Sequence, residues 1–186
     1  MRIESVLRGI ENEASEGKRF LPIVGSVKGN FLHMLAKVTQ AKNVLDIGTL
    51  VGYSALLLAK CVGSKGKVVT IENDENFFKE AVENFKKARV KNILPKLGDA
   101  ETLLKRMPEN KFDLIFLDIW KEDYTKVLDD CTRVLKVNAL LIADNVLWEE
   151  EPLKEWRKTI FNHKNIISFL VPLADGMSVS MKIKST

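Results

Sequence analysis

Cysteine is scarce in this chain of 186 residues, which contains only Cys61 and Cys131. The two cysteines are far apart and form no C-x-x-C motif, so the sequence gives no sign of a zinc site or of a redox pair. Both stand in stretches with a helical pattern, and we expect two reduced thiols in the core of a cytosolic protein.

Long apolar segments are also missing. No run approaches the roughly 18 residues that a membrane span needs. Residues 1–19 are charged throughout and lack the apolar stretch of a signal peptide. Repeats, low-complexity tracts and Pro/Gly-rich linkers are absent as well, so we expect one soluble, cytoplasmic domain over residues 1–186, without a membrane contact.

Blocks of five or more like charges are absent too. The formal net charge is +4, from 29 Lys and Arg against 25 Asp and Glu, and the excess is spread along the chain. A nucleic-acid binder usually concentrates its positive charge on one face, which a sequence alone does not reveal. The charge is therefore compatible with an anionic substrate but does not identify one.

What the chain does contain is an alternation of β-rich apolar runs with amphipathic stretches. The runs predict strands at 43–47, 67–71, 93–97, 112–117 and 139–143, and the stretches between them predict helices at 53–62, 75–89, 100–107 and 124–135. Such alternation is typical of a parallel sheet with helices on both faces. Pro95 marks the third run as an edge strand or a short strand.

The tail follows a different pattern. Residues 165–171 and 178–183 are strand-like, and the segment between them includes the turn residues Asp175 and Gly176. This pattern predicts an antiparallel hairpin at the edge of the parallel sheet. The fold class expected is α/β and Rossmann-like, a seven-stranded and mostly parallel sheet, which resembles the plan of class I methyltransferases.

A glycine-containing loop follows the first predicted strand, with the sequence DIGTLVGYS from Asp46 to Ser54. It reads G-x-x-x-G after an acid, whereas the dinucleotide fingerprint reads G-x-G-x-x-G. A carboxylate would repel pyrophosphate, but it suits the ammonium and sulfonium charges of S-adenosylmethionine. A loop or helix cap is the alternative interpretation of Asp46.

Two more acids follow predicted strands. Glu72 ends the second strand, where a carboxylate can accept both hydroxyls of a ribose. Asp99 lies between Gly98 and Ala100 after the third strand, where it can meet an adenine amino group. The alternatives are an exposed strand-end acid for Glu72 and the N-cap of the next helix for Asp99.

The fourth predicted strand ends at Asp118 and the fifth at Asp144 and Asn145. Neighbouring strands lie roughly 5 Å apart, so two carboxylates and an amide oxygen can face one ion at this edge. An all-oxygen set favours Mg²⁺, Mn²⁺ or Ca²⁺ over zinc. A loop turn is the alternative for an isolated Asp-Asn pair.

Together these segments resemble the metal-dependent O-methyltransferases, the family of catechol and caffeoyl-CoA O-methyltransferases. The resemblance extends from about position 22 to 183 and is carried by VGSVKG at 24–29, DIGTLVGYS at 46–54, TIEN at 70–73, LDIWKEDY at 117–124, ADNVLW at 143–148 and Asp175-Gly176. It implies an N-terminal helical segment over 1–42 and a Rossmann-like core over 43–186.

The resemblance also implies site residues. Mg²⁺ would be held by Asp118, Asp144 and Asn145, and Lys121 would be the general base. The residues expected at S-adenosylmethionine are Val24, Asp46, Gly48, Tyr53, Ser54, Glu72, Asn73, Gly98, Asp99, Ala100, Asp118 and Trp120. Trp120 would line one side of the adenine site, and Trp148 would line one side of the acceptor site, although isolated aromatic residues are more often found in the core.

The chain departs from the catechol branch at positions near both the cofactor and the acceptor. Ile119 replaces a histidine beside Asp118, which removes one possible contact to adenine, and an acid that the catechol branch uses near the substrate hydroxyls falls at Phe169. The N-terminal segment and the segment after Trp148 are short compared with other family members. The resemblance therefore predicts the cofactor and chemistry more firmly than the acceptor.

The sequence thus predicts a methyltransferase that acts on a hydroxyl of a catechol-like small molecule. Two alternatives stay open, a methyltransferase for a hydroxylated nucleoside in tRNA and a module that binds S-adenosylmethionine or a nucleotide without catalysis. A mere binder would need none of Asp118, Lys121, Asp144 and Asn145. The resemblance also gives a weak bias toward a homodimer.

Overall fold

The fold was analysed in a computed structural model that describes residues 2–184. Its helices are α1 (Arg2–Glu16), α2 (Gly25–Val38), α3 (Tyr53–Val62), α4 (Glu75–Ala88), α5 (Ala100–Lys105), α6 (Tyr124–Val134) and α7 (Glu151–Asn162), with a 3₁₀ turn, η1, at Lys121–Asp123. Its strands are β1 (Asn43–Ile47), β2 (Lys67–Glu72), β3 (Ile93–Leu97), β4 (Phe112–Leu117), β5 (Leu135–Asp144), β6 (Ile166–Val171) and β7 (Met177–Lys182).

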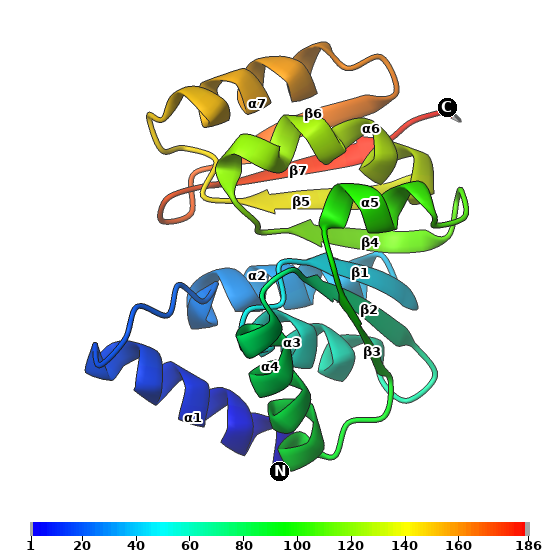
Figure 1. Ribbon diagram of the computed structural model, residues 1–186. Helices are drawn as coiled ribbons and strands as arrows, with labels where there is room; N and C mark the ends of the chain where they lie inside the picture. Colours follow the sequence, from blue (N-terminus) through cyan, green and yellow to red (C-terminus); the bar gives the residue numbers. More distant parts are fainter. Residues whose placement is uncertain (1, 185–186) are drawn as a thin grey trace.

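The seven strands form one sheet in the order β3-β2-β1-β4-β5-β7-β6 (Figure 1). β1 to β5 pair in parallel, and β7 pairs antiparallel with both β5 and β6. The prediction of a mostly parallel sheet that ends in a hairpin is confirmed. β3, which contains Pro95, lies at the sheet edge, where a missing N–H donor costs least.

Helices cover both faces of the sheet (Figure 1). Successive strand residues point to opposite faces, so Val44 packs with α1 to α4 and Leu45 packs with α5 to α7. Both faces of the central strands are therefore buried, which explains their near-continuous apolar sequences. The sheet is fixed between two apolar layers, and its carboxyl edge carries the polar loops.

Some boundaries differ from the prediction. The helix expected over 124–135 ends at Val134, because Leu135 already pairs with Phe112 and opens β5. β5 therefore starts before the expected 139, and Asn138 takes a positive φ of 66° where the register with β4 shifts. α5 ends at Lys105 rather than at 107, and α7 was not predicted.

Both cysteines are buried free thiols, as expected, Cys61 in α3 and Cys131 in α6. Burial raises the pKa of the Cys61 thiol to about 11, which keeps it protonated at neutral pH. Between residues 2 and 184 we find no helix that combines the length and apolar character of a membrane span.

Candidate active site at the carboxyl edge of the sheet

The loop after β1 brings the backbones of two strands into contact. Gly48 has a φ of 107°, and its N–H, like that of Thr49, donates to the Ile71 carbonyl at 3.1 Å. A Cβ at position 48 would lie 1.9 Å from the carbonyl oxygen of Asp118, the residue after β4. Only glycine fits this position, because both the conformation and the space exclude a side chain.

Asp46 in β1 is completely buried beneath this loop. Its Oδ2 accepts a hydrogen bond of 2.6 Å from the Thr70 hydroxyl, whereas Oδ1 has no hydrogen-bond partner among residues 2–184. Burial raises the pKa of Asp46 to about 7, although the hydroxyls of Thr70 and Ser54 lower it in part. Asp46 is therefore not a cap, and its free oxygen is suited to a cationic ligand.

Glu72 at the end of β2 is also buried. Its two oxygens accept hydrogen bonds from the N–H groups of Leu50 at 2.7 Å and of Asn73 and Asp74 at 2.9 Å. The alternative of an exposed strand-end acid is wrong. The backbone donors fix the carboxylate beside the β1 loop, and Oε2, which accepts only from Leu50, keeps a lone pair for a further donor.

Asp99 caps α5, because its Oδ1 accepts a hydrogen bond of 2.8 Å from the Thr102 N–H. This bond lowers the pKa of the Asp99 carboxyl. The N-cap alternative is thus correct, and it leaves the second oxygen of Asp99 for another donor. Gly98 precedes this cap with a φ of 147°, Ala100 begins α5, and Asn73 is exposed after β2.

The other expected cofactor contacts come from two helix starts and a loop. Buried Val24 precedes α2, and Ser54 lies in the first turn of α3. Tyr53 directs its hydroxyl to Glu11 of α1 and lines a separate hollow of about 170 Å³. Trp120 is 74% exposed and Trp148 42% exposed, so the core interpretation of both tryptophans is wrong.

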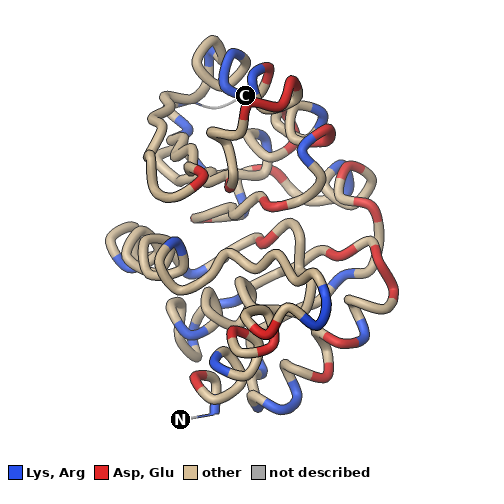
Figure 2. The backbone as a smooth tube through the Cα atoms, turned by 90° about the vertical axis from the view of Figure 1, so that its left-hand side faces the viewer, with Lys and Arg blue, Asp and Glu red and all other residues tan. Residues whose placement is uncertain are grey.

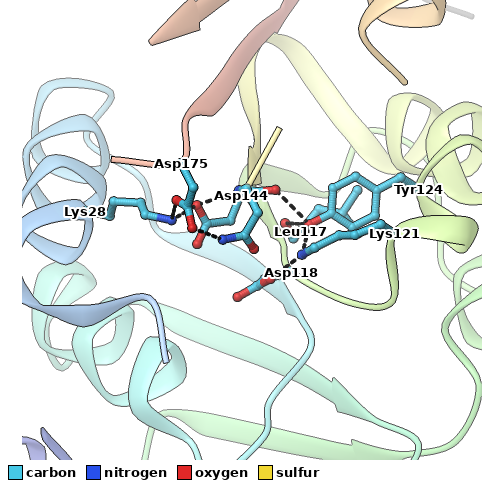
Figure 3. Close-up of polar contacts among 8 residues, drawn as sticks. Lys28, Leu117, Asp118, Lys121, Tyr124, Asp144 and Asp175 are labelled. Atoms are coloured by element: carbon cyan, nitrogen blue, oxygen red, sulfur yellow. Dashed lines mark hydrogen bonds and ion pairs between the residues drawn. The ribbon is translucent and has the colours of Figure 1, made fainter. Parts of the chain in front are cut away.

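Asp118 and Asp144 lie side by side at the ends of β4 and β5. Leu117 pairs with Ala143 in the parallel register, so the two acids are the next residues on neighbouring strands (Figure 3). Asp144 is buried, and burial together with the Asp118 charge raises its pKa to about 6, against the effect of Lys28. The prediction that the fold brings these carboxylates together is confirmed.

A buried lysine compensates this negative charge. Lys28 of α2 forms ion pairs with Oδ1 of Asp144 and Oδ1 of Asp175, the latter in the turn between β6 and β7 (Figure 3). Asp175 Oδ2 accepts a hydrogen bond of 2.7 Å from the side-chain amide of Asn145, which has a φ of 57°. A turn is therefore present at Asp144–Asn145, and its side chains are tied into a charged network.

Lys121 begins η1 beside the two acids, and its side chain is only 12% exposed. Its Nζ lies 2.8 Å from both Asp118 Oδ1 and the Tyr124 hydroxyl. The alternative of an exposed lysine at a helix start is wrong. Tyr124 is fully buried, and its hydroxyl reaches the carbonyls of Leu117 and Asp144, so it holds Lys121 at the strand ends.

The acids do not form a complete metal cage by themselves. Across residues 2–184 there is no group of three or more His, Cys, Asp or Glu side chains arranged to hold a metal ion. A cation beside Asp118 and Asp144 would therefore need the amide oxygen of Asn145 and ligands from outside the protein. A hollow of about 670 Å³ between α6 and α7 includes none of the expected site residues.

Sequence reasoning gave no role to Lys28 or Tyr124 and treated Asp175 only as a turn residue of the hairpin. A signal for Lys28 was present, because the lysine shares one face of α2 with Leu32 and Ala36 at helical spacing. A charge on a buried face requires a partner. Which carboxylates pair with it depends on the packing of α2 against the β6–β7 turn, which has no local signature.

Comparisons with known proteins agree with this architecture. Residues 14–183 match the family described as O-methyltransferase. Catechol O-methyltransferase of Niastella koreensis is 33% identical over 132 residues, covering 69% of this chain and 60% of that protein. Caffeoyl-CoA O-methyltransferase of Eucalyptus gunnii is 26% identical over 180 residues, covering 84% of this chain and 72% of that protein.

Among solved structures, the cofactor-bound Rv0187 from MTB superposes with a TM-score of 0.88 at 25% identity, covering 97% of this chain and 91% of that chain. The match with the Niastella catechol O-methyltransferase, by contrast, covers 60% of that enzyme, which is less than two thirds of its length. The match over residues 14–183 nevertheless includes all the strands and the polar edge described above. The chain belongs to the O-methyltransferase family.

Proposed function

We propose that this protein is an S-adenosylmethionine-dependent and divalent-metal-dependent O-methyltransferase that acts on a catechol-like small molecule. The observation that carries the proposal is the placement of Asp118 next to Asp144 at adjacent strand ends, with Lys121 beside them. The acids that we assign to the methyl donor lie on the same edge of the sheet. Donor and acceptor would then meet at one edge.

S-adenosylmethionine fits the polar groups that follow β1, β2 and β3. The unpartnered oxygen of Asp46 would meet a cationic group of the methionine end. Glu72 would accept the ribose hydroxyls, and the free oxygen of Asp99 would accept from the adenine amino group. The relatives named above are O-methyltransferases, and one solved neighbour is cofactor-bound, which supports this assignment.

A hard divalent cation fits the donor set of Asp118, Asp144 and Asn145. All its ligand atoms would be oxygens, as Mg²⁺ prefers. Burial first and the neighbouring Asp118 charge second raise the pKa of Asp144, and a bound cation would compensate both effects. S-adenosylmethionine supplies a methyl group on a sulfonium, and the cation, when bound, favours the ionised form of an adjacent hydroxyl. Two neighbouring hydroxyls on one ring would match such a site.

Lys121 would accept the proton of the acceptor hydroxyl. In the ion pair with Asp118 the lysine is an ammonium, which has no lone pair for a proton. The base role therefore requires Lys121 to lose a proton to solvent before the acceptor hydroxyl is deprotonated, which a cation bound at Asp118 would favour. The Tyr124 hydroxyl would keep the neutral amine in place. The Trp148 ring, 6.0 Å from Nζ, would provide an apolar wall for a flat acceptor.

The test offers methyl-labelled S-adenosylmethionine and Mg²⁺ together with either a simple catechol or tRNA. We expect label on the catechol. Transfer to tRNA alone would replace the small-molecule acceptor by a nucleoside, and cofactor binding without any transfer would indicate a binding module. Basic and acidic residues are interspersed along the backbone in Figure 2, which gives no reason to prefer an RNA acceptor.

A further inference from the structure

We propose that Asp175, anchored by Lys28, is a positioning residue that decides which end of the Asn145 side chain faces the cation site. The inference rests on the proposed function, because it assigns to Asn145 a ligand role. A side-chain amide has one oxygen and one NH₂ group, and only the oxygen ligates a hard cation. Some neighbouring group must therefore select the correct end.

The hydrogen bonds of Asn145 identify that group. The Nδ2 atom of Asn145 donates to Oδ2 of Asp175 at 2.7 Å. An ionised carboxylate can only accept, so it pairs with the NH₂ end of the amide and never with its oxygen. Because the two ends of the amide point in opposite directions, the carbonyl oxygen is turned away from Asp175.

Backbone contacts hold the two partners in a fixed relation. The N–H of Val146 donates to the Gly176 carbonyl at 3.2 Å, and the N–H of Leu147 donates to the Asp175 carbonyl at 3.0 Å. A Cβ at Gly176 would lie 2.2 Å from Leu147 Cγ, so the turn between β6 and β7 packs directly on the segment after Asn145. The backbone positions of Asp175 and Asn145 are therefore fixed relative to each other, so the Asp175 carboxylate keeps its place while the Asn145 amide rotates.

Lys28 fixes the carboxylate from the other side. Lys28 is a buried residue of α2, and its ammonium group contacts the second oxygen of Asp175 and also Oδ1 of Asp144 (Figure 3). Oδ1 of Asp144 also accepts from the Asn145 N–H at 2.8 Å, whereas Oδ2 has no hydrogen-bond partner in the described part of the chain. Oδ1 of Asp144 and Nδ2 of Asn145 are thus held by these contacts, and Oδ2 of Asp144 and Oδ1 of Asn145 remain available.

These contacts lead to an unusual expectation for Asp175→Asn. The new amide must offer its single oxygen to Lys28, because its NH₂ group would face an ammonium ion. Its NH₂ group then faces Asn145, which turns over and withdraws its oxygen from the cation site. Asp175→Ala instead leaves the Asn145 amide free to rotate, so the isosteric variant should be more harmful than the truncated one.

The experiment measures Mn²⁺ affinity of the full chain from the signal of free Mn²⁺ in electron paramagnetic resonance titrations. Asp175→Asn should weaken binding by about 10- to 100-fold, the range for residues that orient metal ligands. Asp175→Ala should bind Mn²⁺ more tightly than Asp175→Asn. The double variant Asp175→Asn with Asn145→Asp should restore binding, because donor and acceptor are exchanged and the total charge is conserved.

Asp113→Asn is the matched control, because Asp113 also pairs with a lysine, Lys136 at 2.6 Å, but at the opposite end of β4. Asp113→Asn removes one negative charge, as Asp175→Asn does, and its Mn²⁺ affinity should stay within about twofold of the wild-type value. Urea unfolding measures the stability of every variant. Equal losses in Asp175→Asn and Asp175→Ala, or no recovery in the double variant, would overturn the orienting role while the proposed function stands. A wild-type protein that binds no Mn²⁺ removes both.

Discussion

The pH dependence of cofactor binding should follow the ionisation of Asp46. Asp46 is fully buried, and burial raises its pKa to about 7. At pH 6 roughly nine in ten molecules without ligand would therefore hold a proton on this carboxyl. If the cationic end of S-adenosylmethionine requires the carboxylate, the apparent affinity is proportional to the fraction of molecules in which Asp46 is ionised. The affinity at pH 6 is then about a tenth of the affinity at pH 8.

Isothermal titration calorimetry at pH 6, 7 and 8 measures this dependence for the wild type and for Asp46→Asn. The amino group of the ligand also titrates near pH 8, but it is common to both proteins. The difference between the two proteins therefore isolates Asp46. We expect Asp46→Asn to bind more weakly at pH 8 and to lose the slope below pH 7. An equal slope in both proteins would refute the role of Asp46.

The same carboxyl should affect stability in the absence of ligand. Its folded pKa of about 7 exceeds the ordinary value of 3.8, so between these pH values the folded protein keeps a proton that the unfolded chain releases. The free energy of unfolding should therefore fall as pH rises through this window, by up to about 4 kcal/mol from this group. Urea unfolding of Asp46→Asn should lack that contribution; parallel curves for the two proteins would contradict it.

The remaining predictions concern the base, the loop glycine and the ribose acid. Lys121→Ala should lower kcat by about 10²- to 10⁴-fold and leave the Kd for S-adenosylmethionine unchanged; an unchanged kcat would remove Lys121 as the base. Gly48→Ala should lower Tm far more than Gly63→Ala, because both have positive φ but only the Gly48 Cβ would collide with backbone; equal Tm losses would contradict the close approach. Glu72→Gln should weaken cofactor binding at least tenfold by calorimetry, since an amide NH₂ would face backbone donors, and undiminished affinity would exclude the ribose role.

Strands formed by short, mainly apolar runs with clear borders were predicted correctly. The predicted bounds of β1, β3 and β4 agree with the structure, because Gly, Asn or polar residues border each apolar run. The start of β5 was predicted too late, since Lys136 and Asn138 interrupt its pattern and its first residues are strand only because Leu135 pairs with Phe112. Tertiary pairing decided that boundary, and the local sequence could not.

The candidate site shows the same limit. Asp118, Asp144 and Glu72 could be located because acids that directly follow parallel strands must share an edge. The orienting contacts of Lys28 and Asp175 come from a helix and a hairpin turn far away in the sequence, and only packing brings them together. The location in the cytoplasm, the single-domain organisation and the homodimer stay predictions.

The most direct test of the central claim is methyl transfer to a catechol by metal-stripped enzyme. After treatment with a chelator and its removal, the protein should retain calorimetric binding of S-adenosylmethionine but transfer no label. Resupplied Mg²⁺ should restore transfer in the wild type and not in Asp144→Ala, which lacks one of the two adjacent carboxylates. Full transfer by the stripped enzyme, or by Asp144→Ala at wild-type rate, would contradict a shared cation at the ends of β4 and β5.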